Sequence, residues 1–216
     1  MNRSTLLLGS TIGFGVLYLA AAIVLGSTPD PNDSGQQVAA WFRDHDGAVR
    51  AWLWLLTLSL PLFATFATLV RAHLPALYRE LFFFGAIAFA AETAAQGWIW
   101  AGMAWHADDL APATARTLLD VASFWGPVLT GTTVTMLAPV VLLGLREGTG
   151  FPRWLGLLAG VAVAEQLVET VTVFGRHGFI APGGPMNLYL GAALVAASLL
   201  ALGIVTARMR TTTVPA

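Results

Sequence analysis

Six long hydrophobic runs, separated by short polar segments, dominate the pattern of this 216-residue chain. They cover residues 6–25, 51–70, 81–104, 121–145, 154–174 and 186–206. A run of about 20 apolar residues is long enough to cross a hydrocarbon core of about 30 Å as a helix. The pattern therefore predicts an all-α fold, in which residues 1–216 form one polytopic domain, a bundle of six transmembrane helices with no soluble domain.

Composition agrees with a membrane protein, because 56% of the residues are hydrophobic and only 11% are charged. The first run follows Arg3 but is longer than the apolar core of a secretory signal, so we expect a permanent helix there. The net charge of −1 and the lack of a basic patch argue against a nucleic-acid partner. The chain has no cysteine, which excludes disulfides and thiolate ligands, and no lysine, which excludes a retinal Schiff base.

Arginine positions predict the orientation of the helices, since cytoplasmic loops are enriched in positive charge. The arginines that fall on one side are Arg3, Arg71, Arg79, Arg146, Arg153, Arg208 and Arg210. The opposite side contains four arginines and all seven aspartates, namely Arg43, Arg50, Arg116 and Arg176, and Asp30, Asp33, Asp44, Asp46, Asp108, Asp109 and Asp120. We therefore expect both termini in the cytoplasm of a multi-pass protein of the cell membrane.

A short outer helix is predicted before the second run. Ser34 and Gln37 match the capping-box pattern, and the apolar side chains that follow, Val38, Trp41 and Phe42, share one helical face. Such a helix would lie in the outer membrane interface. It would either cover the mouth of the bundle or act as a lid over it.

Two segments carry a resemblance to a known group. Residues 26–56 (GSTPDPNDSGQQVAAWFRDHDGAVRAWLWLL) join the first two runs through an acidic outer loop, and residues 148–161 (GTGFPRWLGLLAGV) lead into the fifth run. Together they resemble a large group of actinobacterial six-helix integral membrane proteins of unknown function. The resemblance implies the same six-helix fold and assigns no chemistry.

Three glutamates interrupt the hydrophobic runs. An ionisable side chain at mid-membrane depth costs at least about 2.5 kcal/mol, so Glu92, Glu165 and Glu169 are candidate functional residues. Residues four apart share a helical face, which pairs Glu165 with Glu169 and Glu92 with Gln96. The two pairs match in depth, so neighbouring third and fifth runs would gather all four into one cluster. The plainer alternative is that each glutamate only forms hydrogen bonds between helices.

A buried carboxyl close to a second one is expected to hold its proton at neutral pH, which suits a general acid or a proton relay. Polar side chains continue from the glutamates only toward the outside, which favours a pocket with a closed cytoplasmic floor over a channel. We expect the pocket to be lined by Phe89, Gln96, Trp98, Trp100, Gln166, Thr170 and Asn187. Aromatic faces among these residues would stabilise positive charge.

Acid beside aromatic faces suits the protonation of an alkene or epoxide and rearrangement of the carbocation. In architecture and acid placement the chain resembles the membrane-embedded terpene cyclases. The sequence thus predicts a metal-independent cyclase or isomerase of an isoprenoid-like substrate, with Glu92, Glu165 and Glu169 as catalytic residues and no cofactor. His106 and His177 fit no metal-ligand spacing. There are two alternatives, a proton-coupled transporter and a non-catalytic lipid-binding or assembly protein. The expected partners are a lipophilic substrate, membrane lipid and further copies of the chain.

Overall fold

A computed structural model describes residues 2–209 and contains no β-strand within them. Six helices or helix pairs in that range are long and apolar enough to cross a membrane, which confirms the all-α six-helix bundle. The helices of the bundle are α1 (Arg3–Leu25), α2 (Gly35–Arg71), α3 (Ala76–Trp105), α5 (Trp125–Leu145), α6 (Arg153–Glu169) and α7 (Ala192–Arg208). Shorter elements complete the spans and loops, namely α4 (Pro112–Ser123), η1 (Ala107–Asp109), η2 (Thr170–Phe174), η3 (Gly178–Ile180) and η4 (Met186–Gly191).

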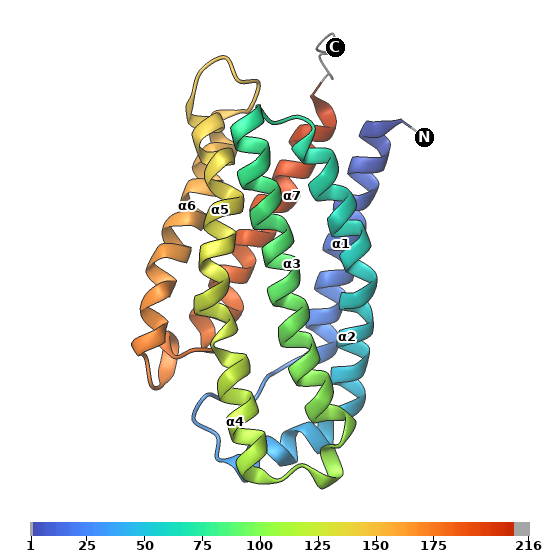
Figure 1. The fold of residues 1–216 in the computed structure, drawn as a ribbon, viewed down its shortest axis with the longest axis vertical. Coiled ribbons are helices and arrows are strands. Elements are labelled where there is room, and N and C mark those ends of the chain that lie inside the picture. The colour runs from blue at the N-terminus through green and yellow to red at the C-terminus, as the bar shows by residue number, and fades with distance from the viewer. Residues whose placement is uncertain (1, 210–216) are drawn as a thin grey trace.

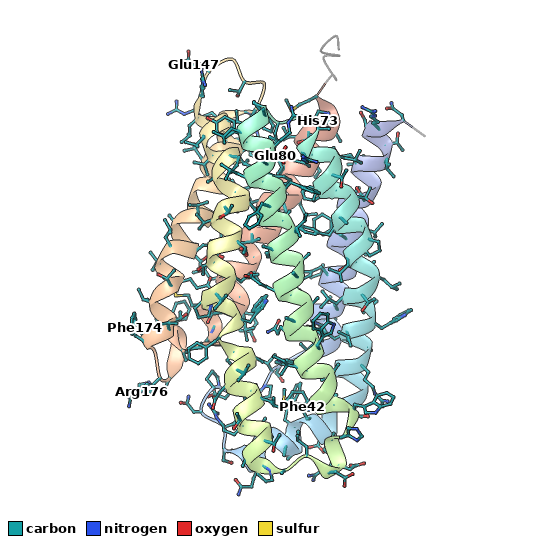
Figure 2. The ribbon with its side chains drawn as sticks, viewed as in Figure 1. Phe42, His73, Glu80, Glu147, Phe174 and Arg176 are labelled. Carbon is teal, nitrogen blue, oxygen red and sulfur yellow. The ribbon has the colours of Figure 1, made fainter. Side chains whose placement is uncertain are left out.

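Both ends of the described chain lie at the same end of the bundle, together with the α2–α3 and α5–α6 connections (Figure 1). We call it the inner end, because the arginine pattern assigns it to the cytoplasm. Among the labelled side chains, His73, Glu80 and Glu147 lie at this end, and Phe42 and Arg176 lie toward the other, outer end (Figure 2). Arg210, which contributed to the predicted orientation, lies outside the described residues.

The predicted outer helix begins where its capping box indicated. Ser34 accepts a hydrogen bond from the Gln37 nitrogen, and the Gln37 side chain accepts one from the Ser34 nitrogen. The helix is not a separate element, however, because it continues without a break into the second span. The 37 residues of α2 reach about 55 Å at 1.5 Å per residue, well beyond a hydrocarbon core of about 30 Å.

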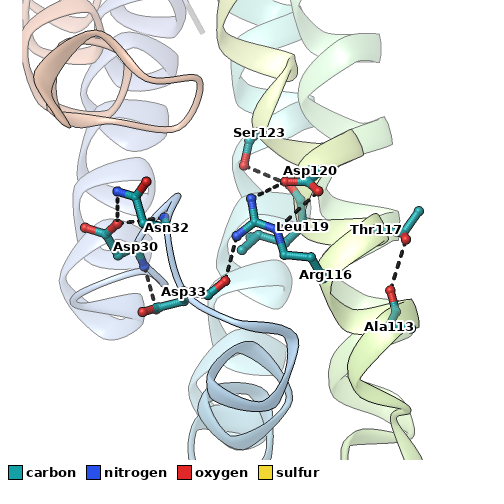
Figure 3. A network of polar contacts seen from close by, with 9 residues as sticks. All are labelled: Asp30, Asn32, Asp33, Ala113, Arg116, Thr117, Leu119, Asp120 and Ser123. Carbon is teal, nitrogen blue, oxygen red and sulfur yellow. Dashed lines mark hydrogen bonds and ion pairs between the residues drawn. The ribbon is translucent and has the colours of Figure 1, made fainter. Parts of the chain in front are cut away.

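The outer parts of α2, α3 and α4 form a cap with its own hydrophobic core, which contains Val38, Phe42, Trp100, Met103 and Leu119. Arg116 on α4 secures the preceding acidic loop by donating to the Asp33 carbonyl oxygen at 2.7 Å and to the Asp120 carboxylate (Figure 3). These contacts favour the first of the two readings, a helix that covers the bundle mouth.

α5 lies between α3 and α6 and packs on both at positions of glycine (Figure 1). A Cβ added to Gly85 of α3 would lie 2.5 Å from the Met136 nitrogen, and one added to Gly156 of α6 would lie 2.8 Å from the Gly144 Cα. Backbones that approach this closely leave no room for a side chain, as in other small-residue contacts of membrane helices. α5 therefore separates the two helices that carry the glutamates.

Candidate functional site

Glu169, the last residue of α6, is the most deeply buried of the three glutamates. Its side chain is 3% exposed, and each of its carboxyl oxygens has an amide partner. Gln166 Nε2 donates to Glu169 Oε2 at 2.6 Å, and Asn187 Nδ2 donates to Glu169 Oε1. Among residues 2–209 no arginine or histidine forms an ion pair with it. Hydrogen bonds from neutral amides, rather than an opposite charge, hold this carboxyl in place.

The orientation of the Asn187 amide is fixed by the backbone. The Gly183 nitrogen donates to Asn187 Oδ1 at 3.0 Å, so Nδ2 is the atom that faces Glu169. Gly183 has a φ of +72°, a conformation that glycine adopts without steric cost. Asn187 belongs to η4, a π-helical turn, and such wide turns recur at functional sites. Asn187 therefore accepts a hydrogen bond from the loop backbone and donates one to the buried Glu169 carboxyl.

Glu165 is joined to Glu169 through a shared donor. Gln166 Nε2 also donates to Glu165 Oε2 at 3.0 Å, and this places one amide group between the two carboxyls. Glu165 Oε1 is buried and has no hydrogen-bond partner among the described residues. The three side chains close over Gly191, where an added Cβ would lie 2.6 Å from Glu169 Oε2. The predicted pairing of Glu165 with Glu169 is thus present, with Gln166 as the bridge.

A cavity of about 70 Å³ lies beside Glu169 at the centre of the bundle, and every spanning segment contributes to its wall. That is several times the roughly 10–15 Å³ needed for one water molecule. Of the three glutamates only Glu169 lines it, together with Gln166 and Asn187. The rest of the wall is largely apolar and includes Phe14, Tyr18, Leu56, Leu60, Phe63, Phe89, Trp125, Leu129, Val195 and Leu199.

Aromatic rings form one side of this cavity. Phe63 packs against Phe14 with ring centroids 5.6 Å apart and against Phe89 at 5.7 Å. Trp125 and Tyr18 add an indole and a phenol from α5 and α1. Ring faces carry the negative part of the aromatic quadrupole and attract cations. A positive charge that develops in the cavity would therefore meet both aromatic rings and the Glu169 carboxyl in its wall.

The inner half of the bundle is closed by a continuous hydrophobic core, which includes Leu7, Phe66, Val70, Phe82, Met136, Leu137, Val140, Leu155 and Leu202, each at most 1% exposed. Toward the outside, a second cavity of about 20 Å³ shares Trp125, Gly126 and Asn187 with the first and reaches Thr28 and Pro29 of the outer loop. The polar part of the wall thus continues toward the outer loop, in agreement with the distribution of polar residues along the sequence.

Glu92 does not join the other two glutamates, so the predicted four-membered cluster does not form. The reason is the position of α5, whose Thr132 hydroxyl lies 2.8 Å from Glu92 Oε2. This hydroxyl is the donor to Glu92, and it shares its proton with the Leu129 carbonyl oxygen, which lies 2.9 Å away. Glu92 is half-buried and outside the central cavity, in a contact between two helices. This is the arrangement of a structural hydrogen bond.

The other predicted pocket residues divide into three groups. Phe89, Gln166 and Asn187 line the central cavity. Gln96 and Trp100 line the second cavity, which lies nearer the outer loop. Trp98 and Thr170 lie on the exposed surface instead; Trp98 is 71% exposed, and the Thr170 hydroxyl donates to the Leu167 carbonyl oxygen at 2.7 Å. Neither of these two contributes to a cavity.

Two polar residues of the wall, Tyr18 and Thr93, were not expected from the sequence, and the fourth run offered four threonines without showing which of them faces the cavity. Tyr18 had a usable signal, because a phenol stands alone in the middle of the first hydrophobic run. Trp125 stands near the outer end of the fourth run, a position typical of the interfacial aromatic belt, yet it lines both cavities. Thr133 is one of four threonines in the fourth run, and only the packing of α5 shows that it faces the centre.

Fold and site together define the class of the protein, a six-helix membrane protein with a blind, carboxyl-bearing cavity that leads outward. No three His, Asp or Glu side chains within residues 2–209 lie close enough together to hold a metal ion. No family model, curated protein or solved structure matches this chain. The resemblances to actinobacterial six-helix proteins and to membrane-embedded cyclases therefore stay predictions.

Proposed function

We propose that this protein is a cyclase or isomerase of the cell membrane that acts by acid catalysis on a lipophilic, isoprenoid-like substrate. The observation that carries the proposal is the Glu169 carboxyl, which is buried, held by two amides and exposed only to an aromatic-lined cavity. General acids are placed within reach of the substrate in this way, with their orientation fixed by neighbouring hydrogen bonds.

Glu169 acts as the proton donor in this scheme. Its O–H proton is transferred to an alkene carbon or an epoxide oxygen, which leaves a carbocation on the substrate and a carboxylate on the enzyme. Gln166 and Asn187 then donate to both carboxylate oxygens. Preorganised donors aimed at a developing charge lower the barrier because they need no reorganisation during the reaction.

The aromatic wall stabilises the cation while the substrate rearranges. A neighbouring double bond attacks the cationic carbon to close a ring, or a C–H proton is lost directly to form a shifted alkene. The released proton returns to the Glu169 carboxylate, so the enzyme ends as it began and the substrate gains or loses no atoms. Cavity walls that exclude water keep the cation from being trapped as an alcohol.

Glu165 serves as a positioning residue in this proposal. It does not line the cavity, but it shares the Gln166 amide with Glu169 and so fixes the direction of that donor. Glu92 has no part in the reaction, because it lies outside the cavity.

The test is to replace Glu92, Glu165 and Glu169 by Gln one at a time and to measure turnover of linear isoprenoid alkenes and epoxides in nanodiscs. Glu169→Gln should abolish turnover, Glu165→Gln should reduce it, and Glu92→Gln should leave it unchanged. Full turnover by Glu169→Gln would refute acid catalysis by this residue. Proton uptake into liposomes that requires Glu169 would instead favour the proton-coupled transporter, for which the closed inner half offers no path in this conformation.

A further inference from the structure

Thr133 stands apart from the other threonines of α5. The hydroxyls of Thr130, Thr132 and Thr135 each donate to a carbonyl oxygen of their own helix at 2.7–2.9 Å. The Thr133 side chain is 0% exposed, lines the central cavity, and has no hydrogen-bond partner within residues 2–209. A threonine hydroxyl in a helix usually donates to a carbonyl oxygen of the preceding turn. A hydroxyl on a cavity wall that makes no such bond is available to a ligand.

A second unpaired donor lines the same cavity. Trp125 Nε1 is buried without a partner, and indole nitrogen can only donate. Trp125 and Thr133 lie eight residues apart on α5, about 12 Å along the helix axis, with Trp125 nearer the outer end of the bundle. Thr172 and Thr206 are also buried and unpaired, but neither lines a cavity. The two buried donors without partners among the described lining residues of this cavity thus both come from α5, and the unpaired Glu165 oxygen lies outside its wall.

The hydroxyls of Ser59 and Thr93, on α2 and α3, line the same wall and are already satisfied. Ser59 donates to the Leu56 carbonyl oxygen at 2.7 Å, and Thr93 donates to the Phe89 carbonyl oxygen at 2.8 Å. The cavity therefore offers hydrogen-bond donors at defined places and is not uniformly polar. Buried donors without partners are rare in folded proteins and call for an explanation.

We infer that the ligand of this cavity is an oxygenated lipophile, an epoxide, ketone or similar compound, whose acceptor oxygen is bound by the Thr133 hydroxyl. Trp125 Nε1 donates to a second acceptor on ligands that reach it. A pure hydrocarbon would leave both donors unpaired, and sites built to bind an oxygen discriminate strongly against analogues without one. The inference rests on the proposed function, in that it names the substrate class of the same cavity.

The probes are sulcatone, a small isoprenoid ketone, and its analogue in which a methylene group replaces the carbonyl oxygen. Binding of each to the protein in nanodiscs is measured by ligand-induced thermal stabilisation, and the ratio of the two affinities is compared between variants. Because every variant is measured in the same lipid, partitioning of the probes cancels in this comparison. The wild-type protein should prefer the ketone, and Thr133→Val should lower the preference by about three- to tenfold.

Matched controls separate hydrogen bonding from changes in packing. Thr93→Val removes a hydroxyl from the same wall that is already satisfied, and it should keep the preference. Thr133→Ser retains a hydroxyl and should also keep it; Thr133→Ala serves as a second test of its removal if the valine variant does not fold. Equal binding of ketone and analogue by the wild-type protein would overturn the inference, since water then satisfies the donor. Loss of preference in Trp125→Phe but not in Thr133→Val would overturn the assignment to Thr133.

The same measurements on Glu169→Gln keep this inference separate from the proposed function. If that variant retains turnover while the wild-type protein prefers the ketone, acid catalysis by Glu169 fails and the binding site stands. If turnover depends on Glu169 but the preference is absent, only the present inference fails.

Discussion

Asn187 and Glu169 are 18 residues apart in the sequence, yet the amide of one donates directly to the carboxyl of the other. This contact joins the end of α6 to the π-helical turn before α7, and it fixes the only glutamate that lines the central cavity. We therefore expect the stability of the site and the proposed chemistry both to depend on it.

Removal of the Asn187 amide should destabilise the protein. Asn187→Leu leaves a carboxyl oxygen of Glu169 and the Gly183 N–H without partners, and a buried unsatisfied polar group costs about 1–3 kcal/mol. Thermal unfolding in detergent is the measurement. In the double variant Glu169→Gln, Asn187→Leu the two effects should be non-additive by at least about 0.5 kcal/mol, since the residues are in contact. Strict additivity would show that the contact contributes nothing.

Gly191 should tolerate no side chain. Its added Cβ would lie 2.6 Å from Glu169 Oε2 and 2.9 Å from Gln166 Nε2, so Gly191→Ala should displace the carboxyl and lower turnover at least tenfold. Gly131→Ala is the matched control on a spanning helix, because nothing lies within 4 Å of its added Cβ. It should retain turnover and gain slight stability from the better helix propensity of alanine. Equal turnover by the two variants would contradict the position assigned to Glu169.

The contact of α5 with α6 should depend on Gly144. An added Cβ would lie 2.5 Å from the Gly156 Cα, a backbone atom that cannot move aside, so Gly144→Ala should force the helices apart. We expect a loss of about 1–3 kcal/mol, the usual cost of overpacking, measured as a lower unfolding midpoint. Gly160→Ala, whose nearest atom would be Val141 Cγ1 at 3.8 Å, should leave the midpoint nearly unchanged.

Glu92 should prove dispensable for turnover but not for helix packing. Glu92→Gln keeps a group that can accept from Thr132, whereas Glu92→Leu removes it. Interhelical hydrogen bonds in membranes contribute about 0.6 kcal/mol on average, so a small loss of stability is expected for Glu92→Leu alone. Parallel turnover and unfolding assays would check this, and a large loss of turnover in Glu92→Gln would restore this residue to the catalytic set.

Cysteine labelling should report the orientation of the bundle, and the absence of native cysteine leaves no background. Thr149→Cys, in the α5–α6 connection, should react with a membrane-impermeant maleimide only after the cells are opened. Asp108→Cys, in the outer loop, should react in intact cells. The reverse result would place the cavity on a path to the cytoplasm and contradict the assignment from arginine.

The sequence predicted the contacts of Glu165 correctly and those of Glu92 wrongly. The pairing of Glu165 with Glu169 followed from helix periodicity alone, because residues four apart share a face in any α-helix. The predicted cluster with Glu92 required the third and fifth runs to pack against each other. Hydrophobic runs of similar length do not show which helices are neighbours. Glycines on α3 and α6 decided that relation by allowing α5 to pack between them.

The sequence by itself determined that the chain forms six apolar helices and that carboxyl groups interrupt them, because hydrophobicity and helical period are local properties of the chain. It did not show that the second helix continues unbroken from the outer capping box at Ser34. Tertiary structure alone decided which of those carboxyls faces a cavity, that Asn187 and Gln166 hold it, and that Thr133 and Trp125 remain unpaired beside it. Each of these facts depends on side chains from different helices, and their spacing is set by close contacts that no single helix contains.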